Sequence, residues 1–171
     1  WNINQNLHLK IEPYFQYLFR IPVEKNSSFS VINHEEFYLD RILTNTGQGR
    51  NYGIDITLEQ YMKNGFYYMI TGSLFKSKYR GGDNVWRNTR LDKNYLLNLL
   101  AGKEWMVGKL KQNVLSLNGR LFFQGGERYT PVNEERSQTE HDIFFDETKA
   151  YSKRFNPSIN GDVSVSFRIN K

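Results

Sequence analysis

The feature of this sequence that most constrains its fold is a long-range alternation of apolar and polar residues. Between Leu7 and Phe19 the odd positions are apolar or aromatic, whereas the even positions begin with His8, Lys10 and Glu12. The alternation recurs, with varying sharpness, in five further segments: 52–58, 66–79, 95–105, 113–124 and 158–169. A repeat of two residues places the two kinds of side chain on opposite faces of an extended strand. The sequence therefore predicts an all-β fold with about six antiparallel strands.

The connections between these segments alternate between short and long. One short connection contains Asn64-Gly65, a dipeptide that tight hairpin turns favour, and another spans 107–112. The three long, polar connections cover 24–48, 80–90 and 125–154. We expect all short turns at one end of an up-and-down meander and all long loops at the other. This arrangement, with strands longer than the average of about five or six residues, is typical of outer-membrane barrels.

Aromatic residues gather beside the short turns. Tyr61, Phe66, Tyr67 and Tyr68 bracket the first turn, and Trp105 precedes the second. Aromatic rings with one polar edge are enriched at membrane interfaces, so this placement predicts an interfacial girdle. The alternative is a row of aromatic cross-strand pairs in a soluble sandwich.

Composition excludes several classes of protein. The chain has 171 residues and no Cys, which rules out a disulfide scaffold, a thiol nucleophile and a thiolate metal site. No apolar run is long enough for a transmembrane helix. The formal net charge is +5, but cations and carboxylates are interleaved, so we expect no nucleic-acid partner. The chain begins at Trp1 without a secretory leader, and we expect a processed protein or an excised piece.

The segment from Asn45 to Glu59, NTGQGRNYGIDITLE, resembles the strand that follows a large external loop in TonB-dependent outer-membrane receptors. Shorter similarities follow in order along the chain, in 64–67, 72–79, 94–105 and 125–131. The chain is most similar to receptors of the Bacteroidetes type. The resemblance implies that residues 1–171 are part of the C-terminal half of a large transmembrane β-barrel, without the plug domain and the final strands.

The same resemblance implies a location in the outer membrane of a Gram-negative bacterium. The parent protein would take up a scarce, large ligand, such as an iron chelate, a cobalamin-like cofactor or a glycan, with TonB-coupled energy. Its partners would be outer-membrane lipid, the plug domain, the TonB complex and the small-molecule or glycan ligand. The isolated chain would self-associate through its outer strands. The alternative is a small self-closed barrel that binds an apolar ligand, either lipocalin-like or in the outer membrane.

If the apolar faces meet lipid, the opposite faces line a barrel lumen. The expected lumen-facing residues are Lys10, Glu12, Asp55, Glu59, Asn98, Glu104, Arg120, Asp162 and Arg168. They would contact the plug or a passing ligand, or form mutual charge pairs that keep the interior hydrated, and we favour the charge pairs. Ligand selection is expected in the external loops, through Phe29, Phe37, Tyr38, Trp86, Arg128 and Tyr129.

No constellation of residues predicts an enzyme. His34-Glu35-Glu36 and His141-Asp142 with Asp146 and Glu147 match no known metal-ligand spacing, and no Gly-x-Ser-x-Gly elbow is present. We therefore expect no catalytic, metal-binding or cofactor-binding residues. The glycine pairs 81–82 and 125–126 are expected to permit positive φ at loop bends.

Overall fold

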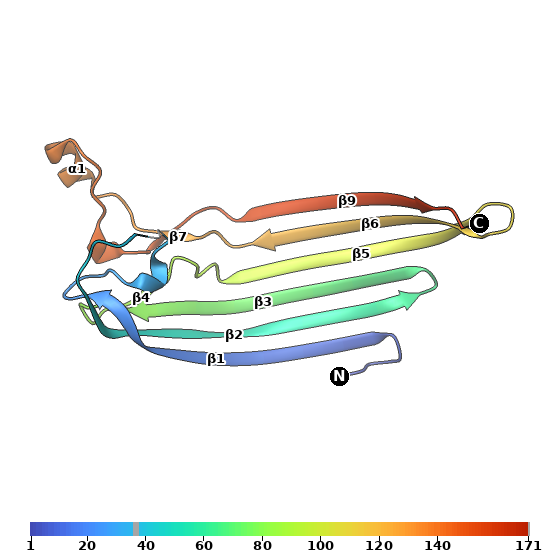
Figure 1. The fold of residues 1–171 in the computed structure, drawn as a ribbon, viewed down its shortest axis with the longest axis horizontal. Coiled ribbons are helices and arrows are strands. Elements are labelled where there is room, and N and C mark those ends of the chain that lie inside the picture. The colour runs from blue at the N-terminus through green and yellow to red at the C-terminus, as the bar shows by residue number, and fades with distance from the viewer. Residues whose placement is uncertain (36–37, 171) are drawn as a thin grey trace.

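The computed structural model describes residues 1–35 and 38–170 and shows an antiparallel sheet of six long strands (Figure 1). These strands are β1 (Leu7–Glu24), β2 (Leu43–Lys63), β3 (Phe66–Arg80), β5 (Tyr95–Val107), β6 (Asn113–Gln124) and β9 (Ser158–Arg168). They lie in the sheet in the order in which they occur along the chain. The predicted all-β meander of six strands is confirmed.

Short elements occupy the long connections. They are η1 (Val31–Asn33), β4 (Trp86–Asn88), β7 (Arg128–Tyr129), α1 (Glu134–Glu140), η2 (Glu147–Lys149) and β8 (Lys153–Arg154). Strand β4 pairs with the end of β3, and β7 pairs with β8 in a separate two-stranded sheet. The sequence pattern did not predict these elements. Five of them have only two or three residues, which are too few to show a period, and the seven residues of α1 are all polar and form no apolar stripe.

Short turns and long connections lie at opposite ends of the sheet, and both chain termini lie at the turn end (Figure 1). Asn64 and Gly65 join β2 to β3 with φ values of 54° and 72°. Two consecutive positive φ values are those of the type I′ turn that Asn-Gly favours. The backbone of this turn also approaches β5 closely, since a Cβ on Gly65 would lie 2.4 Å from the carbonyl oxygen of Glu104.

The glycine pairs 81–82 and 125–126 do not have the positive φ that the sequence predicts. Among the glycines of the described chain, only Gly65 and Gly108 have positive φ. The pairs instead allow close backbone contacts: a Cβ on Gly82 would lie 1.9 Å from the carbonyl oxygen of Glu24, and one on Gly125 would lie 1.9 Å from that of Lys93. These glycines therefore hold the connections together rather than bend them.

Directly paired residues of an antiparallel sheet point to the same face. One row of pairs crosses all six long strands: Leu9, Leu58, Ile70, Leu99, Leu121 and Gly161. Another row contains Glu12, Asp55, Ser73, Leu96, Gln124 and Ser158. We call the first the apolar face and the second the polar face. Because the alternation stays in phase from strand to strand, both faces are continuous.

The apolar face is not buried by any part of the described chain. Its residues include Phe15 with 68% of its surface exposed, Leu74 with 61% and Val163 with 78%. The accessible surface is 12119 Å², whereas a compact folded protein of this mass exposes about 8,800 Å². The buried hydrophobic residues are few: Val23, Tyr79, Val114 and Ala150. The described residues thus form a sheet that lacks an ordinary hydrophobic core.

Aromatic residues of the apolar face form two bands. The turn-end band consists of Phe66, Tyr68, Trp105 and Phe167, and the loop-end band of Phe15, Tyr17, Phe19, Tyr52, Tyr95 and Phe123. Two of the predicted girdle residues do not belong to either band. The Tyr67 hydroxyl donates to Asn118 Oδ1 on the polar face at 2.8 Å, and the Tyr61 ring packs against His8 at 4.8 Å. Only Phe66, Tyr68 and Trp105 of that set share the apolar face.

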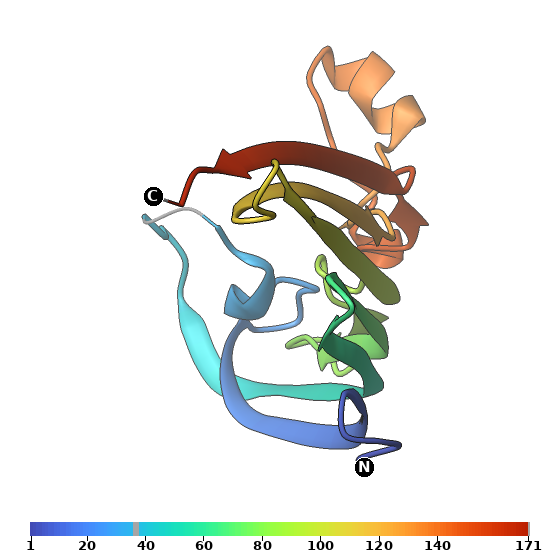
Figure 2. The ribbon, with the colours of Figure 1, turned by 90° about the vertical axis from the view of Figure 1, so that its right-hand side faces the viewer.

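The sheet is curved and open. Seen from the turn end, the strands follow an arc whose two ends are β1 and β9 (Figure 2). In the described chain β1 and β9 are the edges of the sheet and do not pair with each other, so the strands form no closed barrel. The alternative of a small self-closed barrel is therefore not supported. In residues 1–35 and 38–170, no helix has the length and hydrophobicity needed to cross a membrane.

Candidate functional site

The three long connections fold together at the loop end of the sheet, and Arg90 contacts two of them from the third. Its guanidinium forms ion pairs with Glu35 and, at 2.6 Å, with Glu127. Its backbone N–H donates to Asn33 Oδ1 at 2.9 Å. We call the described parts of 25–42, 81–94 and 125–157 the loop platform. Arg90 therefore joins all three segments of this platform.

A buried carboxylate anchors the platform to the sheet. Asp92 is 0% exposed, and its Oδ1 accepts a hydrogen bond from the backbone N–H of Ser77 on β3 at 3.0 Å. The pairing of β3 with β5 ends at Leu74, so this side chain takes the place of a carbonyl acceptor beyond the ladder. Arg128 Nε donates to Asp92 Oδ2 at 2.8 Å, and Arg154 lies 3.6 Å from the same oxygen. The carboxylate thus connects β3 to the β7–β8 hairpin.

A tyrosine pair closes the platform over the polar face. The rings of Tyr79 and Tyr151 meet edge to face, with 6.0 Å between centroids, and Tyr79 is fully buried. Burial and, secondly, the negative charge of Glu147 raise the pKa of Tyr151. Glu147 also accepts a hydrogen bond from Ser28 Oγ, which brings the first connection against the third. This phenol remains protonated at neutral pH and packs as an uncharged ring.

An open groove of about 480 Å³ lies in the platform. Its lining consists of Arg90, Glu127, Arg128, Tyr129, Thr130, Val132, Phe145, Glu147, Tyr151 and Phe155. The rings of Tyr129 and Phe155 stack at 4.5 Å, and both residues are partly exposed. The groove's two cations are paired with carboxylates, so it offers aromatic surfaces and hydrogen-bonding groups rather than a strong positive field. Such a groove suits a ligand with flat apolar faces and neutral polar groups.

The structure separates the five described residues among the six that are predicted to contact a ligand. Arg128 and Tyr129 line the groove, whereas Phe29 and Tyr38 line another hollow of about 510 Å³. In that hollow the Arg41 guanidinium lies 4.4 Å from the centre of the Phe29 ring, and Tyr38 is 76% exposed. Phe37 lies outside the described residues.

Trp86 occupies a different place from Phe29, Tyr38, Arg128 and Tyr129. It lies on β4 and pairs with Arg80 of β3, which the register places on the apolar face. The Arg50 guanidinium lies 4.1 Å from the centre of its ring. Trp86 therefore extends the loop-end aromatic region of the apolar face and does not line the groove.

All nine residues expected to face a lumen lie on the polar face. The expectation that they pair mutually by charge is largely wrong, because among the described residues Lys10 and Glu12 form the one such ion pair, at 2.8 Å. Neutral partners serve others: Asp55 accepts from the Ser73 hydroxyl at 2.5 Å, and Arg120 Nε donates to Asn98 at 2.9 Å.

Sequence reasoning missed the residues that build the platform. Asp92, Arg90 and Glu127 carry no local pattern, since their partners lie tens of residues away in sequence. In the segment 125–128 the sequence singles out the glycine pair and Arg128 but gives no sign of the role of Glu127. Within residues 1–35 and 38–170, no group of three or more His, Asp or Glu side chains could hold a metal ion.

The chain was compared with protein-family models, curated proteins and solved structures. No protein-family model, no curated protein and no solved structure matches this chain.

Proposed function

We propose that this chain is a segment of a transmembrane β-barrel in which the apolar face contacts lipid and the polar face borders an aqueous lumen. The observation that carries the proposal is the continuous apolar face, exposed across all six long strands and backed by a continuous polar face. A soluble domain of this size would bury such a surface, because each exposed Å² of apolar surface costs about 25 cal/mol. Hydrocarbon removes that cost without any further protein layer.

The spacing of the two aromatic bands supports the same proposal. On β5, Tyr95 and Trp105 are ten residues apart on the apolar face, which is about 34 Å along a strand. A strand tilted by about 40° would separate them by about 26 Å along the membrane normal. The lipid-facing band of outer-membrane barrels is about 25 Å tall and is flanked by aromatic girdles. The residues between the bands are mainly Leu, Ile and Val.

The end of the sheet that carries the platform is assigned to the outside of the cell. Long external loops and short periplasmic turns are characteristic of outer-membrane barrels. We therefore place the protein in the outer membrane of a Gram-negative bacterium. Its open edges, β1 and β9, would pair with further strands of a larger barrel, and in isolation they would drive self-association.

Within this setting, we assign the parent protein to the TonB-dependent receptors of the Bacteroidetes type, on the resemblance of residues 45–59 and the shorter segments after them. Its partners would be outer-membrane lipid, a plug domain and the TonB complex. The parent would take up a scarce, large ligand and carry out no catalysis. The charge-balanced aromatic groove favours a glycan or a cobalamin-like ligand over a strongly anionic iron chelate.

Lipid contact at Trp105 tests the proposal. The chain has three tryptophans, so Trp1→Phe with Trp86→Phe leaves Trp105 as the single reporter. In phosphatidylcholine vesicles with brominated acyl chains, we expect strong quenching of its fluorescence. The matched control adds Trp105→Phe and Met106→Trp, which moves the reporter to the adjacent residue on the opposite face. Equal quenching at both positions, or none at 105, would refute lipid contact.

A further inference from the structure

Four cations lie together on the apolar face at the loop end. Arg50 of β2 is directly opposite Lys78 of β3, Lys76 is opposite Tyr52, and Arg80 is opposite Gln48. Lys76, Lys78 and Arg80 occupy successive positions on the same face of one strand. We call Arg50, Lys76, Lys78 and Arg80 the cationic cluster. It begins where the loop-end aromatic band meets the platform.

The cluster is electrostatically unfavourable as it stands. Like charges directly opposite each other across two strands destabilise a sheet, as Arg50 and Lys78 do. The described apolar face carries no carboxylate in β1 up to Phe19 or in β2, β3, β5, β6 and β9. All the carboxylates of these segments lie on the polar face, so the uncompensated positive charge is specific to one side of the sheet.

The contacts of the cluster are with neutral groups. Arg50 stacks over Trp86, and Lys76 Nζ donates to Asn94 Oδ1 at 2.9 Å. Arg80 Nε is buried without a hydrogen-bond partner among the described residues. A buried donor without a partner costs about 1–3 kcal/mol, which adds to the unfavourable energy of the cluster.

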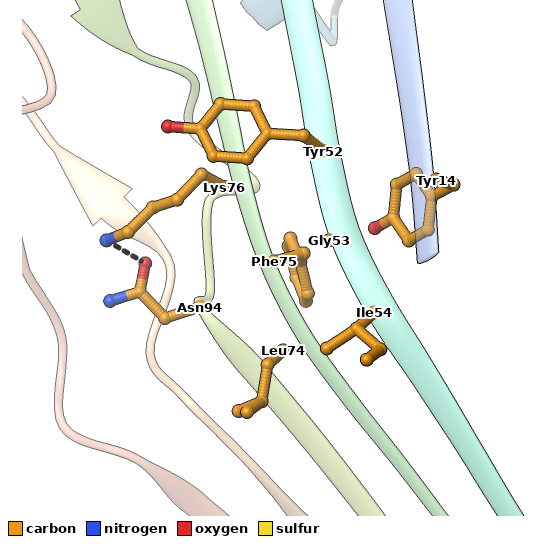
Figure 3. Close-up of a pocket in the computed structure, with 8 residues that line it drawn as sticks. All are labelled: Tyr14, Tyr52, Gly53, Ile54, Leu74, Phe75, Lys76 and Asn94. Carbon is orange, nitrogen blue, oxygen red and sulfur yellow. Dashed lines mark hydrogen bonds between the residues drawn. The ribbon is translucent and has the colours of Figure 1, made fainter. Parts of the chain in front are cut away.

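An apolar hollow of about 540 Å³ adjoins the cluster. Tyr52, Ile54 and Leu74 line it, together with Lys76 (Figure 3). The register places Tyr52, Ile54, Leu74 and Lys76 on the apolar face, whereas Tyr14, Gly53 and Phe75, which also line the hollow, belong to the polar face. A positively charged rim and a hydrocarbon hollow therefore lie next to each other.

We propose that the cationic cluster binds the phosphate-bearing headgroup of a membrane lipid, with an acyl chain of that lipid in the adjoining hollow. Phosphate oxygens accept paired hydrogen bonds from Arg, and a phosphate places its negative charge between Arg50 and Lys78. The hollow lies beside the cluster, so one lipid can occupy both with its headgroup and its acyl chain, whereas a free anion can occupy only the cationic side. This inference rests on the proposed function, since it requires the apolar face to lie in lipid.

The test uses Trp86, which stacks on Arg50, as the single tryptophan after Trp1→Phe and Trp105→Phe. Vesicles of phosphatidylcholine receive either brominated phosphatidic acid or brominated phosphatidylcholine of the same chain length. We expect phosphatidic acid to quench Trp86 at a much lower mole fraction. Lys78→Gln with Arg80→Gln should weaken that preference about thirtyfold. Lys25→Gln with Lys153→Gln removes the same charge from exposed loop-end positions and should leave the preference unchanged.

The outcomes separate this inference from the proposed function. Equal quenching of Trp86 by both lipids, with Trp105 also quenched, would overturn the headgroup site and leave the membrane assignment in place. Absence of quenching at both tryptophans would overturn both. If Lys25→Gln with Lys153→Gln also loses the preference for phosphatidic acid, the attraction depends on overall charge, and the headgroup site is overturned. If inorganic phosphate, at the same concentration as the lipid phosphate, displaces phosphatidic acid and relieves the quenching, the site binds free anions and the proposal of a lipid ligand is overturned.

Discussion

Arg128 Nε donates a 2.8 Å hydrogen bond to Asp92, a carboxylate that is 0% exposed at the junction of the sheet and the loop platform. This contact fixes the third long connection to the second. A buried carboxylate is stable there because Ser77 N–H and two guanidinium groups surround it. The loop platform therefore depends on one buried ionic group.

Asp92→Asn should loosen the platform without disturbing the strands. The substitution leaves Arg128 and Arg154 without their carboxylate, and because both remain partly solvated we expect a loss of about 2–3 kcal/mol in local stability. Hydrogen–deuterium exchange should become faster in 89–93 and 127–129. Glu135→Gln, at an exposed position on α1, is the matched control. Unchanged exchange in Asp92→Asn would contradict the anchoring role.

Acid should release the turn around Asp83. Burial raises the pKa of this carboxyl, but hydrogen bonds from Arg87 and from the N–H of Val85 outweigh it and lower the pKa below its ordinary value of 3.8. The stabilisation is therefore fully present above pH 3.8 and is lost as the pH falls through the lower, folded value. The protection factor of the Val85 amide, which corrects for the intrinsic exchange rate at each pH, should fall in that range. In Asp83→Asn this protection factor should be low and constant over the same range, and a constant protection factor in the parent chain would contradict the linkage.

An added charge should lower stability much more on the apolar face than on the polar face. Leu99 lies near the centre of the apolar face, and Thr71, on the adjacent strand β3, lies near the centre of the polar face. Arg at position 99 should cost about 2–4 kcal/mol of stability in a bilayer, as for lipid-facing positions near the membrane midplane. Thr71→Arg, opposite the uncharged Thr57 and Asn98, should cost less than about 1 kcal/mol. Urea unfolding from vesicles measures both, and similar losses would contradict the assignment of the faces.

The isolated chain should associate in water. Its edges β1 and β9 carry unpaired backbone groups on their outer sides, and its apolar face has no cover within the described residues. Size-exclusion chromatography without detergent should give oligomers, and detergent should dissociate them. A monodisperse monomer in plain buffer would count against the barrel segment.

The sheet could be predicted from the sequence because each face has one environment along its whole length. The alternation through Leu9, Leu58 and Leu121 is therefore visible within each segment, and the Asn64-Gly65 turn fixes the pairing of β2 and β3. The register of β1 against β2 shifts after Phe19. The sequence does not predict these shifts, because a bulge leaves no regular pattern.

The platform could not be predicted in the same way. Its contacts join residues far apart in sequence, such as Ser28 with Glu147. The sequence predicts Trp86 in a ligand-binding loop, because a strand of three residues is too short to show alternation of apolar and polar residues. In the structure, β4 places Trp86 beside Arg80 on the apolar face. Arg128 was expected to contact ligand, but its guanidinium is largely engaged by Asp92.

A cysteine scan of β9 tests the central claim most directly. The chain contains no Cys, so single substitutions from 162 to 167 can each carry a nitroxide label. In vesicles, the account predicts high accessibility to oxygen at 163, 165 and 167 and to a water-soluble nickel reagent at 162, 164 and 166. A profile without this two-residue period, or with the opposite phase, would contradict the claim that the apolar face lies in lipid.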